Sequence, residues 1–431
     1  MNFYFYSVHT IHGILKQYWG FDKFRPLQEE IIHSVLDGKD TLALLPTGGG
    51  KSVCFQVPAM AMEGVCLVIS PLIALMKDQV YNLQLKGIKA VAVYSGLPHR
   101  VSEALLDSCV FGQTKFLYIS PERLASDDFR ERMQRMKICL LAVDEAHCIS
   151  QWGYDFRPQY TKIAEVREKL TKVPVIALTA TATPKVVDDI QDKLLFRKKL
   201  VLQQSFVRKN LSFTVRNTEN KEQQMLDILT KVKGSAVVYV RNRKRTQDYA
   251  KILNRHKLKA DFYHAGLQPN ERSQRQDDWI NNKTRIICCT NAFGMGIDKP
   301  DVRTVIHMDL ADSLEAYYQE AGRAGRDEQK AYAVQLFANN DLLDLDKNIK
   351  EGFPETAFIK DVYEWLCGYL NIAYNDGANK GFDFDLGAFA DSVKQNPVKL
   401  MSALRILAQQ EVLGLSDNQF QLSQVKCISP K

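Results

Sequence analysis

The chain of 431 residues contains 45% hydrophobic and 25% charged residues, which is typical of globular protein and excludes a disordered chain or a collagen-like fibre. Its formal net charge of +7 is a mild bias toward polyanionic partners. No apolar run reaches the roughly 18–20 residues of a membrane span, and the N-terminal segment lacks the features of a secretory signal. We therefore expect two or three domains without membrane contact, in the cytoplasm (at the nucleoid in a bacterium, in the nucleus in a eukaryote).

The first part of the chain alternates apolar, strand-like segments with stretches of helical length. Each segment ends in a turn-forming or small polar residue, and the segments are 40–46, 65–71, 90–96, 115–122, 138–147 and 173–181. Continuous apolar strands separated by helices predict an α/β fold with a parallel sheet that is covered on both faces. In such sheets ligands bind at the carboxyl ends of the strands.

A second series of the same kind follows a basic stretch near residues 197–210, and its segments are 235–240, 260–266, 284–291, 302–309 and 332–337. It predicts a second α/β lobe. We expect the first lobe to span residues 1–204 and the second to span residues 205–339.

The remaining residues, 340–431, have a different pattern. Helical patterns at 357–370 and 397–412 are followed by two short strands within 412–422 around an Asp-Asn turn. This order favours a small C-terminal helical, winged-helix-like module. A helical cap that only packs on the second lobe is the alternative.

A glycine-rich turn follows the first strand-like segment. Glycines let backbone N–H groups converge on phosphate oxygens, and the residues concerned are Thr47, Gly48, Gly49, Gly50, Lys51 and Ser52. Lys51 would reach the β and γ phosphates of a nucleotide, and the Ser52 hydroxyl would ligate magnesium. The strict phosphate-loop pattern has glycine where this chain has Leu45, and a purely structural turn is the alternative.

Paired carboxylates follow the fifth strand-like segment, in the sequence Asp144-Glu145-Ala146-His147. At a strand end in the same sheet as the glycine-rich turn, Asp144 would hold magnesium and Glu145 would polarise the attacking water. His147 completes the segment and is grouped with the catalytic candidates. A solvated sheet edge is the alternative for the two carboxylates.

These motifs resemble those of the RecQ-type DNA helicases of superfamily two. The segments TGGGKS, DEAH, TATAT and QEAGRAGRD occur in the family's order, and the resemblance extends from Leu15 to Phe337. It implies two tandem RecA-like lobes that bind ATP and Mg²⁺, with single-stranded and forked DNA as partners. It also implies movement in the 3′→5′ direction, in DNA repair or recombination.

The resemblance assigns adenine recognition to the element QYWGFDKFRPLQ. Gln28 would pair with the adenine edge, since an amide offers one donor and one acceptor, and Phe21 and Arg25 would sandwich the ring. The alternative is an amphipathic N-terminal helix with a buried Trp19.

DNA contacts are implied for two segments of the first lobe. In TATAT, the Thr179 and Thr181 hydroxyls would contact DNA phosphates or the DEAH segment. In the aromatic-rich loop 147–158, Trp152 and Phe156 would stack on unpaired bases, together with Tyr154, and Arg157 would contact a phosphate or an acidic residue. Plain β-structure and aromatic core packing are the respective alternatives.

In the second lobe the resemblance covers residues 290–302 and 317–327. Asp298 would orient a ribose or an arginine. Arg326 would be the arginine finger, and Arg323 would contact or support the γ-phosphate, so that hydrolysis depends on both lobes. A surface helix with exposed arginines is the alternative.

The chain departs from the family's pattern in three ways. Ala311 and Glu328 stand where proline and glycine are usual. The family's zinc module has four cysteines, but only Cys367 and Cys427 lie in that region, so no zinc is predicted; the nine cysteines are expected to be reduced thiols, most of them in the core. The additional C-terminal DNA-binding domain is also not found in this sequence.

The function predicted is that of an ATP-dependent DNA helicase. Two alternatives remain open: an RNA helicase or duplex translocase, and an ATP-gated DNA clamp that does not unwind. Protein partners cannot be inferred from the sequence.

Overall fold

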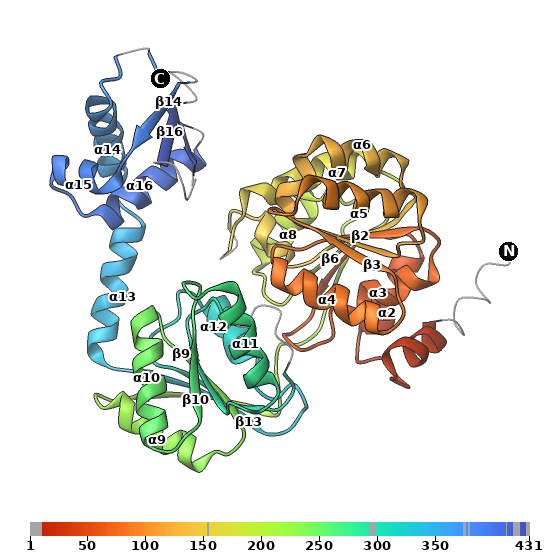
Figure 1. Cartoon of the computed structure of the whole chain (residues 1–431), viewed down its shortest axis with the longest axis horizontal. Helices are drawn as coiled ribbons and strands as arrows, with labels where there is room; N and C mark the ends of the chain where they lie inside the picture. Colours follow the sequence, from red (N-terminus) through yellow and green to blue (C-terminus); the bar gives the residue numbers. More distant parts are fainter. Residues whose placement is uncertain are drawn as a thin grey trace. The chain divides into compact units, whose positions relative to one another are not determined.

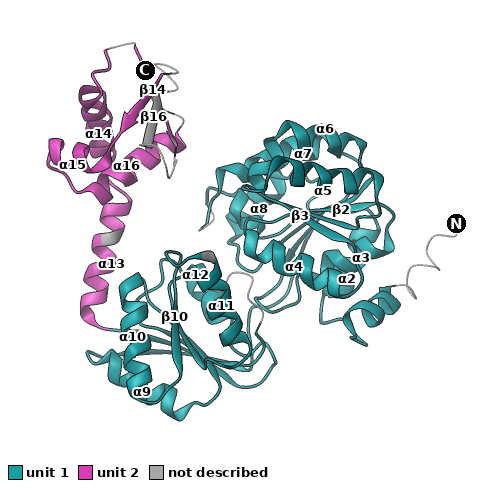
Figure 2. Cartoon of the chain, viewed as in Figure 1, with its two compact units in different colours: residues 1–337 teal, residues 338–431 magenta. Residues whose placement is uncertain are grey.

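The computed structural model describes residues 11–152, 155–293, 299–373, 376–377, 380–410, 412–416 and 423–427. The chain divides into two compact units, Met1–Phe337 and Ala338–Lys431 (Figure 2). Within the described ranges, no helix is both long and apolar enough to cross a bilayer.

The first sheet of the larger unit has seven parallel strands in the order β3-β4-β2-β5-β6-β1-β7. Their bounds are β1 Thr41–Leu44, β2 Val65–Ile69, β3 Ala90–Val93, β4 Phe116–Ile119, β5 Ile138–Val143, β6 Val175–Thr179 and β7 Val201–Gln203. The first six lie within the six segments predicted from the sequence, so the predicted parallel sheet is confirmed.

Helices cover both faces of this sheet (Figure 1). Alternate side chains of one strand enter different cores: Leu42 packs with one cluster and Ala43 with the other. One face is covered by α2 (Gln28–Leu36), α3 (Val53–Ala61) and α4 (Ile73–Leu85), and the other by α5 (His99–Phe111), α6 (Asp127–Arg135), α7 (Ile163–Lys169) and α8 (Pro184–Lys193). Short helical segments η1 (Leu15–Trp19), η2 (Pro121–Ala125), η3 (Ala146–Ile149) and η4 (Pro158–Lys162) complete this part.

The second sheet of the same unit has six parallel strands in the order β10-β11-β9-β12-β13-β8. The strands are β8 Leu211–Asn217, β9 Ser235–Tyr239, β10 Ala260–Tyr263, β11 Ile286–Cys289, β12 Val302–His307 and β13 Ala331–Phe337. Helices α9 (Lys221–Lys231) and α10 (Arg243–Arg255) cover one face, and α11 (Pro269–Ile280) and α12 (Leu314–Ala321) cover the other. The α/β architecture with two parallel sheets is therefore as predicted.

The smaller unit begins with α13 (Asn339–Gly352) and continues as α14 (Thr356–Tyr369), β14 (Gly381–Phe384), α15 (Leu386–Val393), α16 (Pro397–Gln409), β15 (Leu413–Ser416) and β16 (Ser423–Cys427). Its antiparallel sheet has the order β14-β16-β15, and α14, α15 and α16 share one apolar core with it. This is the predicted winged-helix-like arrangement. The second strand of the hairpin begins at Ser423, after the segment in which it was expected; residues 417–422 lie outside the described part.

Eight cysteines are described as free thiols. Seven of them are buried and Cys367 is half-buried. Their location agrees with the prediction of reduced cysteines, most of them in the core.

Candidate nucleotide site and aromatic loop

The glycine-rich loop connects β1 to α3. Gly48 and Gly50 have positive φ angles of 81° and 74°, which glycine adopts without strain. A Cβ atom on Gly49 would lie 2.9 Å from the Pro46 carbonyl oxygen, and one on Gly50 would lie 2.4 Å from Gln28 Nε2. The loop therefore excludes side chains at these positions and presents bare backbone beside Lys51.

The element predicted to read adenine contacts this loop directly. Gln28, at the start of α2, is buried, and its Nε2 donates to the carbonyl oxygens of Gly49 and Gly50, both at 3.1 Å. Arg25 donates through its side chain to the Gly48 carbonyl. Phe21 is 56% exposed. In this structure the Gln28 amide thus holds the phosphate loop, and its pairing with adenine stays a prediction.

The two predicted carboxylates follow β5, next to Lys51. Glu145 has a φ of 45°, a left-handed conformation that is uncommon for a non-glycine residue and often marks functional sites. Its Oε1 lies 3.8 Å from Lys51 Nζ. Burial, followed by the charge of Glu145, raises the pKa of Asp144 to about 7, and Lys51 only partly offsets this.

The pKa of Glu145 is shifted the other way. Burial alone would raise it, but the charges of Lys51, His147 and Arg323 together lower it below its ordinary value. Two adjacent carboxyl groups therefore differ in acidity, with Glu145 the one that remains ionised. This difference suits a site in which Glu145 orients water and Asp144 binds a cation.

His147 connects the DEAH segment to TATAT. Its ring is buried, burial lowers its pKa, and its Nδ1 lies 2.8 Å from Thr179 Oγ1. The Thr179 hydroxyl is fully buried and donates to the Thr181 carbonyl at 3.1 Å. Of the two roles expected for Thr179, the structure supports contact with the DEAH segment and gives no support to direct DNA contact. Thr181 is also buried, and its hydroxyl has no hydrogen-bond partner among the described residues.

Arginines that follow α12 reach the same place from the second sheet. A Cβ atom on Gly48 would lie 3.0 Å from Arg326 Cγ, and one on Gly322 would lie 3.0 Å from Thr47 Cβ. Arg323 is buried, and its charge is one of those that lower the pKa of Glu145. The structure therefore brings both predicted arginines to the phosphate loop and the carboxylates. Asp298 lies outside the described residues.

A cavity of about 710 Å³ lies between these groups. Its lining includes Phe21, Arg25, Gln28, Thr47, Gly48, Gly50, Lys51, Ser52, Asp144, Glu145, Gln319, Arg323 and Arg326. The volume is within the ordinary range of small-molecule sites. The Thr47 hydroxyl is buried without a hydrogen-bond partner among the described residues, and Asp144 carries a strongly raised pKa. These features fit a phosphate chain and a divalent cation.

The aromatic loop leaves this site from η3. Trp152 is 62% exposed, and Lys185 Nζ of α8 lies 3.1 Å from the centroid of its ring. Phe156 lies farther along, with Lys193 Nζ 5.7 Å from its ring centroid. Tyr154 lies outside the described residues. Trp152 is therefore a surface ring, as the predicted base-stacking role requires.

Arg157 is fixed by the protein itself. Its guanidinium donates to Asp155 Oδ2 at 3.1 Å and to the Pro71 carbonyl oxygen at 3.0 Å. Of the two predicted partners, an acidic residue and a phosphate, the structure supplies the acidic residue. Arg157 therefore ties the end of the aromatic loop to the segment that follows β2.

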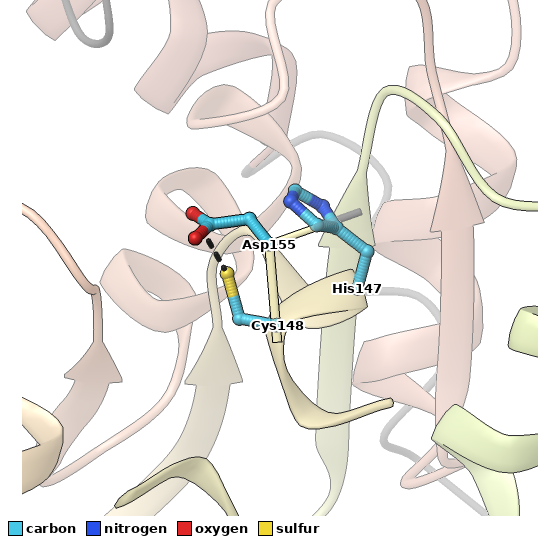
Figure 3. A group of neighbouring side chains, drawn as sticks. All are labelled: His147, Cys148 and Asp155. Carbon is cyan, nitrogen blue, oxygen red and sulfur yellow. Dashed lines mark hydrogen bonds between the residues drawn. The ribbon is translucent and has the colours of Figure 1, made fainter. Parts of the chain in front are cut away.

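Figure 3 shows His147, Cys148 and Asp155, whose potential ligand atoms all lie within 4.8 Å of one another. The Cys148 thiol donates to Asp155 Oδ2 at 3.8 Å, and burial raises the pKa of that thiol. The same carboxylate oxygen accepts from Arg157, and Thr179 lies at the His147 ring. Partners within the protein, one of them cationic, thus account for the group without a metal ion.

Two tyrosines of the site were not predicted from the sequence. The Tyr160 hydroxyl donates to the Asp144 carbonyl oxygen at 3.0 Å. The Tyr239 hydroxyl, at the end of β9, donates to the Phe293 carbonyl oxygen at 3.1 Å and accepts a hydrogen bond from the Arg323 side chain. The only sequence signal for Tyr239 is its place at the carboxyl end of a buried strand.

Two parallel sheets that share one cavity, with a lysine and paired carboxylates on one side and arginines on the other, define a superfamily two helicase. The DEAD/DEAH box helicase model matches residues 25–190, and the helicase conserved C-terminal domain model matches residues 220–328. Within this class, the chain belongs to the RecQ-type family.

Relatives of the chain support this assignment. It is 42% identical over 331 residues to a probable ATP-dependent DNA helicase RecS of Bacillus subtilis, which covers 76% of this chain and 66% of the relative. It is 42% identical over 339 residues to the ATP-dependent DNA helicase RecQ of the same organism, covering 78% and 57%. It is 41% identical over 361 residues to the RecQ-like DNA helicase blm-1 of Caenorhabditis elegans, covering 80% and 36%. The chain thus spans between about a third and two thirds of these relatives.

Solved structures share the fold at low sequence identity. S. cerevisiae Dbp5 bound to RNA and ADP BeF3 is similar with a TM-score of 0.61 and 19% identity, covering 78% of this chain and 90% of that chain. Mycobacterium smegmatis helicase Lhr bound to ssDNA and AMP-PNP has a TM-score of 0.60 and 18% identity, covering 96% and 60%.

Proposed function

We propose that this chain is the motor of an ATP-dependent DNA helicase, which couples ATP hydrolysis to 3′→5′ movement on single-stranded DNA and to duplex unwinding. The observation that carries the proposal is the convergence of Lys51, Glu145 and Arg323 on one cavity. Identity of about 40% to named DNA helicases supports the choice of substrate.

ATP would bind with its phosphates on Gly48–Ser52. Lys51 would neutralise the β and γ phosphates, and Ser52 and Asp144 would hold Mg²⁺. A bound magnesium ion offsets the negative charge that develops on the phosphates. Loss of the Asp144 proton would accompany metal binding, because burial and the charge of Glu145 raise the pKa of this carboxyl and the metal would bind its deprotonated form.

Hydrolysis needs a water molecule held in line with the γ-phosphate. Glu145, which stays ionised beside Lys51, would orient that water. Arg323 and Arg326 would stabilise the charge on the γ-phosphate from the opposite side. Because they come from the second lobe, catalysis would require both lobes around one nucleotide.

Adenine recognition would involve Phe21, Arg25 and Gln28, with Asp298 near the ribose. Gln28 would have to give up its bonds to Gly49 and Gly50 to pair with the base. We propose that this exchange links the presence of adenine to the shape of the phosphate loop.

DNA would lie along the first lobe with bases against Trp152 and Phe156. Forked DNA is the proposed unwinding substrate. We infer three functional parts, residues 1–204, 205–339 and 340–431, of which the last would contact the duplex. A DNA substrate favours a location with the chromosome, at the cytoplasmic nucleoid or in the nucleus, and a role in repair or recombination; no zinc is proposed.

An RNA helicase is the second candidate, because a relative that is 41% identical over 334 residues is named a putative ATP-dependent RNA helicase. The test is ATP hydrolysis by purified protein with single-stranded DNA, RNA of the same sequence, or blunt duplex DNA. The proposal expects single-stranded DNA to stimulate hydrolysis most. Equal or stronger stimulation by RNA would favour the second candidate, and stimulation by duplex alone would indicate a translocase.

A further inference from the structure

Helix α8 runs beside the aromatic loop and carries a lysine near each end. It packs on η3, from which the loop leaves. Lys185 Nζ lies over the Trp152 ring, and Lys193 Nζ lies near Phe156. Buried residues of α8 and η3 share one apolar core, which fixes the helix against the start of the loop.

The two lysines differ in their partners. Lys193 donates to the Ile149 carbonyl oxygen at 3.1 Å and lies 3.3 Å from an Asp189 carboxylate oxygen. Lys185 is exposed and, among the described residues, makes no hydrogen bond or ion pair; its contact is the Trp152 ring, 3.1 Å from the ammonium. Lys193 is therefore fixed by two polar partners, whereas Lys185 has no carboxylate partner in the part of the chain that the structure describes.

The nearest acidic side chains of α8 are engaged elsewhere. Asp192 pairs with Lys199 at 2.7 Å, and Asp188 lies 4.0 Å from the same ammonium. Asp189 lies by Lys193. Among the described residues, no carboxylate is paired with the Lys185 ammonium that lies on the exposed Trp152 ring, a combination that suits a nucleotide with a base and a phosphate.

We propose that Lys185 adds a phosphate contact to the base-stacking site expected at Trp152, so that a base of single-stranded DNA lies on the indole while the Lys185 ammonium binds a backbone phosphate. A cation over an exposed ring is held more weakly than a stacked base. An entering base therefore displaces the ammonium from the ring, and its flexible four-carbon stem carries it to the phosphate. This inference rests on the proposed DNA-dependent function and adds a residue outside the motifs of the family.

This phosphate contact makes a specific prediction about salt. For single strands, each phosphate contact contributes about 0.7 to the slope of log K against log salt concentration. Lys185→Ala should lower the magnitude of that slope by about 0.7. Trp152→Ala should weaken binding with little change in slope, because stacking involves no counterion release.

The experiment is fluorescence anisotropy of a labelled oligo-dT strand with the whole chain, titrated at several salt concentrations. Lys185→Arg should restore the slope, since it keeps the charge. Lys199→Ala, which removes an exposed lysine that is paired with Asp192 of α8, is the matched control and should keep the wild-type slope.

A wild-type slope in Lys185→Ala would overturn the phosphate contact and leave Lys185 as a support for the ring. That result would leave the proposed function intact, provided that the wild-type chain binds the strand and hydrolyses ATP in response. Failure of the wild-type chain to bind the strand would instead contradict the proposed function.

Discussion

Arg326 packs against Gly48 of the phosphate loop, so closely that a Cβ atom on Gly48 would lie 3.0 Å from Arg326 Cγ. Gly48 lies in the loop that follows β1 of the first sheet, and Arg326 lies between α12 and β13, which belongs to the second sheet. A nucleotide on the loop would therefore meet groups from both sheets, which is the arrangement that makes hydrolysis depend on their relative position.

Removal of the finger tests this arrangement. Arg326→Ala should lower kcat for ATP hydrolysis by about 10³-fold, because an arginine finger acts mainly on the transition state. The KM for ATP should change little. Arg216→Ala removes an exposed arginine of the second sheet that donates a hydrogen bond to Gln224, away from the phosphate loop, and it should behave as wild type. A small effect on kcat would show that Arg326 is not the finger.

Lys51 should be essential for hydrolysis and dispensable for DNA. Lys51→Ala should reduce ATP turnover by at least about 10²-fold, since the phosphates lose their main cation. Affinity for single-stranded DNA, measured without nucleotide, should remain. Lys39→Ala, at an exposed lysine beside Asp37, is the control. Normal turnover in the Lys51 variant would refute the assignment of the site.

Tyr239 should position Arg323. Tyr239→Phe removes the hydroxyl that bridges the Phe293 carbonyl and the Arg323 side chain. The loss of one hydrogen bond to a charged group costs about 1.5 kcal/mol, or about tenfold in kcat. The KM for ATP and the melting temperature should both be unchanged, whereas a general loss of folding would lower the melting temperature together with the apparent kcat. Tyr249→Phe, which removes a hydroxyl bonded to Arg245 of α10, provides the comparison.

Asp40 should stabilise the first sheet through its charge. The carboxylate is fully buried and accepts from Arg167 at 3.0 Å and from Arg197 at 2.8 Å. Asp40→Asn leaves buried Arg167 without its counter-charge and should lower the free energy of unfolding by about 3 kcal/mol. Asp37→Asn, at an exposed neighbour, should have little effect.

The Asp40 carboxylate should also make the free energy of unfolding depend on pH. Burial alone would raise the pKa of Asp40, but hydrogen bonds from Arg197 and Val175 and the charge of Arg167 lower it below 3.8. A lowered pKa stabilises the folded state above the unfolded value, and this stabilisation is lost as the pH falls through the folded value. The stability difference between wild type and Asp40→Asn should therefore be full at neutral pH and shrink below about pH 3.8. A stability difference that stays constant as the pH falls would contradict a lowered pKa for Asp40.

Burial explains which strands could be predicted. β1 to β6 are nearly continuous runs of apolar, buried residues, and the sequence identifies them. β7 has three residues, and β8 lies at the edge of its sheet with Val215 66% exposed, so neither gives a strong apolar run. In the smaller unit, α14 and α16 were predicted, but α13, α15 and β14 were not, because their exposed faces weaken the pattern.

In the site, too, some features could be predicted from the sequence and others could not. The loop 47–52 and the carboxylates at 144 and 145 are contiguous motifs and were predicted. The bonds of Gln28 to the phosphate loop and of Tyr239 to Arg323 join residues far apart in the chain, and the packing of the sheets determines them. Local spacing carries no information about such contacts.

The most direct test of the whole account is strand separation on a forked duplex with a 3′ single-stranded tail. The comparison is between the wild-type chain and Glu145→Gln, which keeps the shape of the side chain that faces Lys51. The account predicts that wild type separates the strands only with ATP and Mg²⁺, and that the variant binds the fork without unwinding it. Equal unwinding by the variant, or unwinding without ATP, would contradict the account.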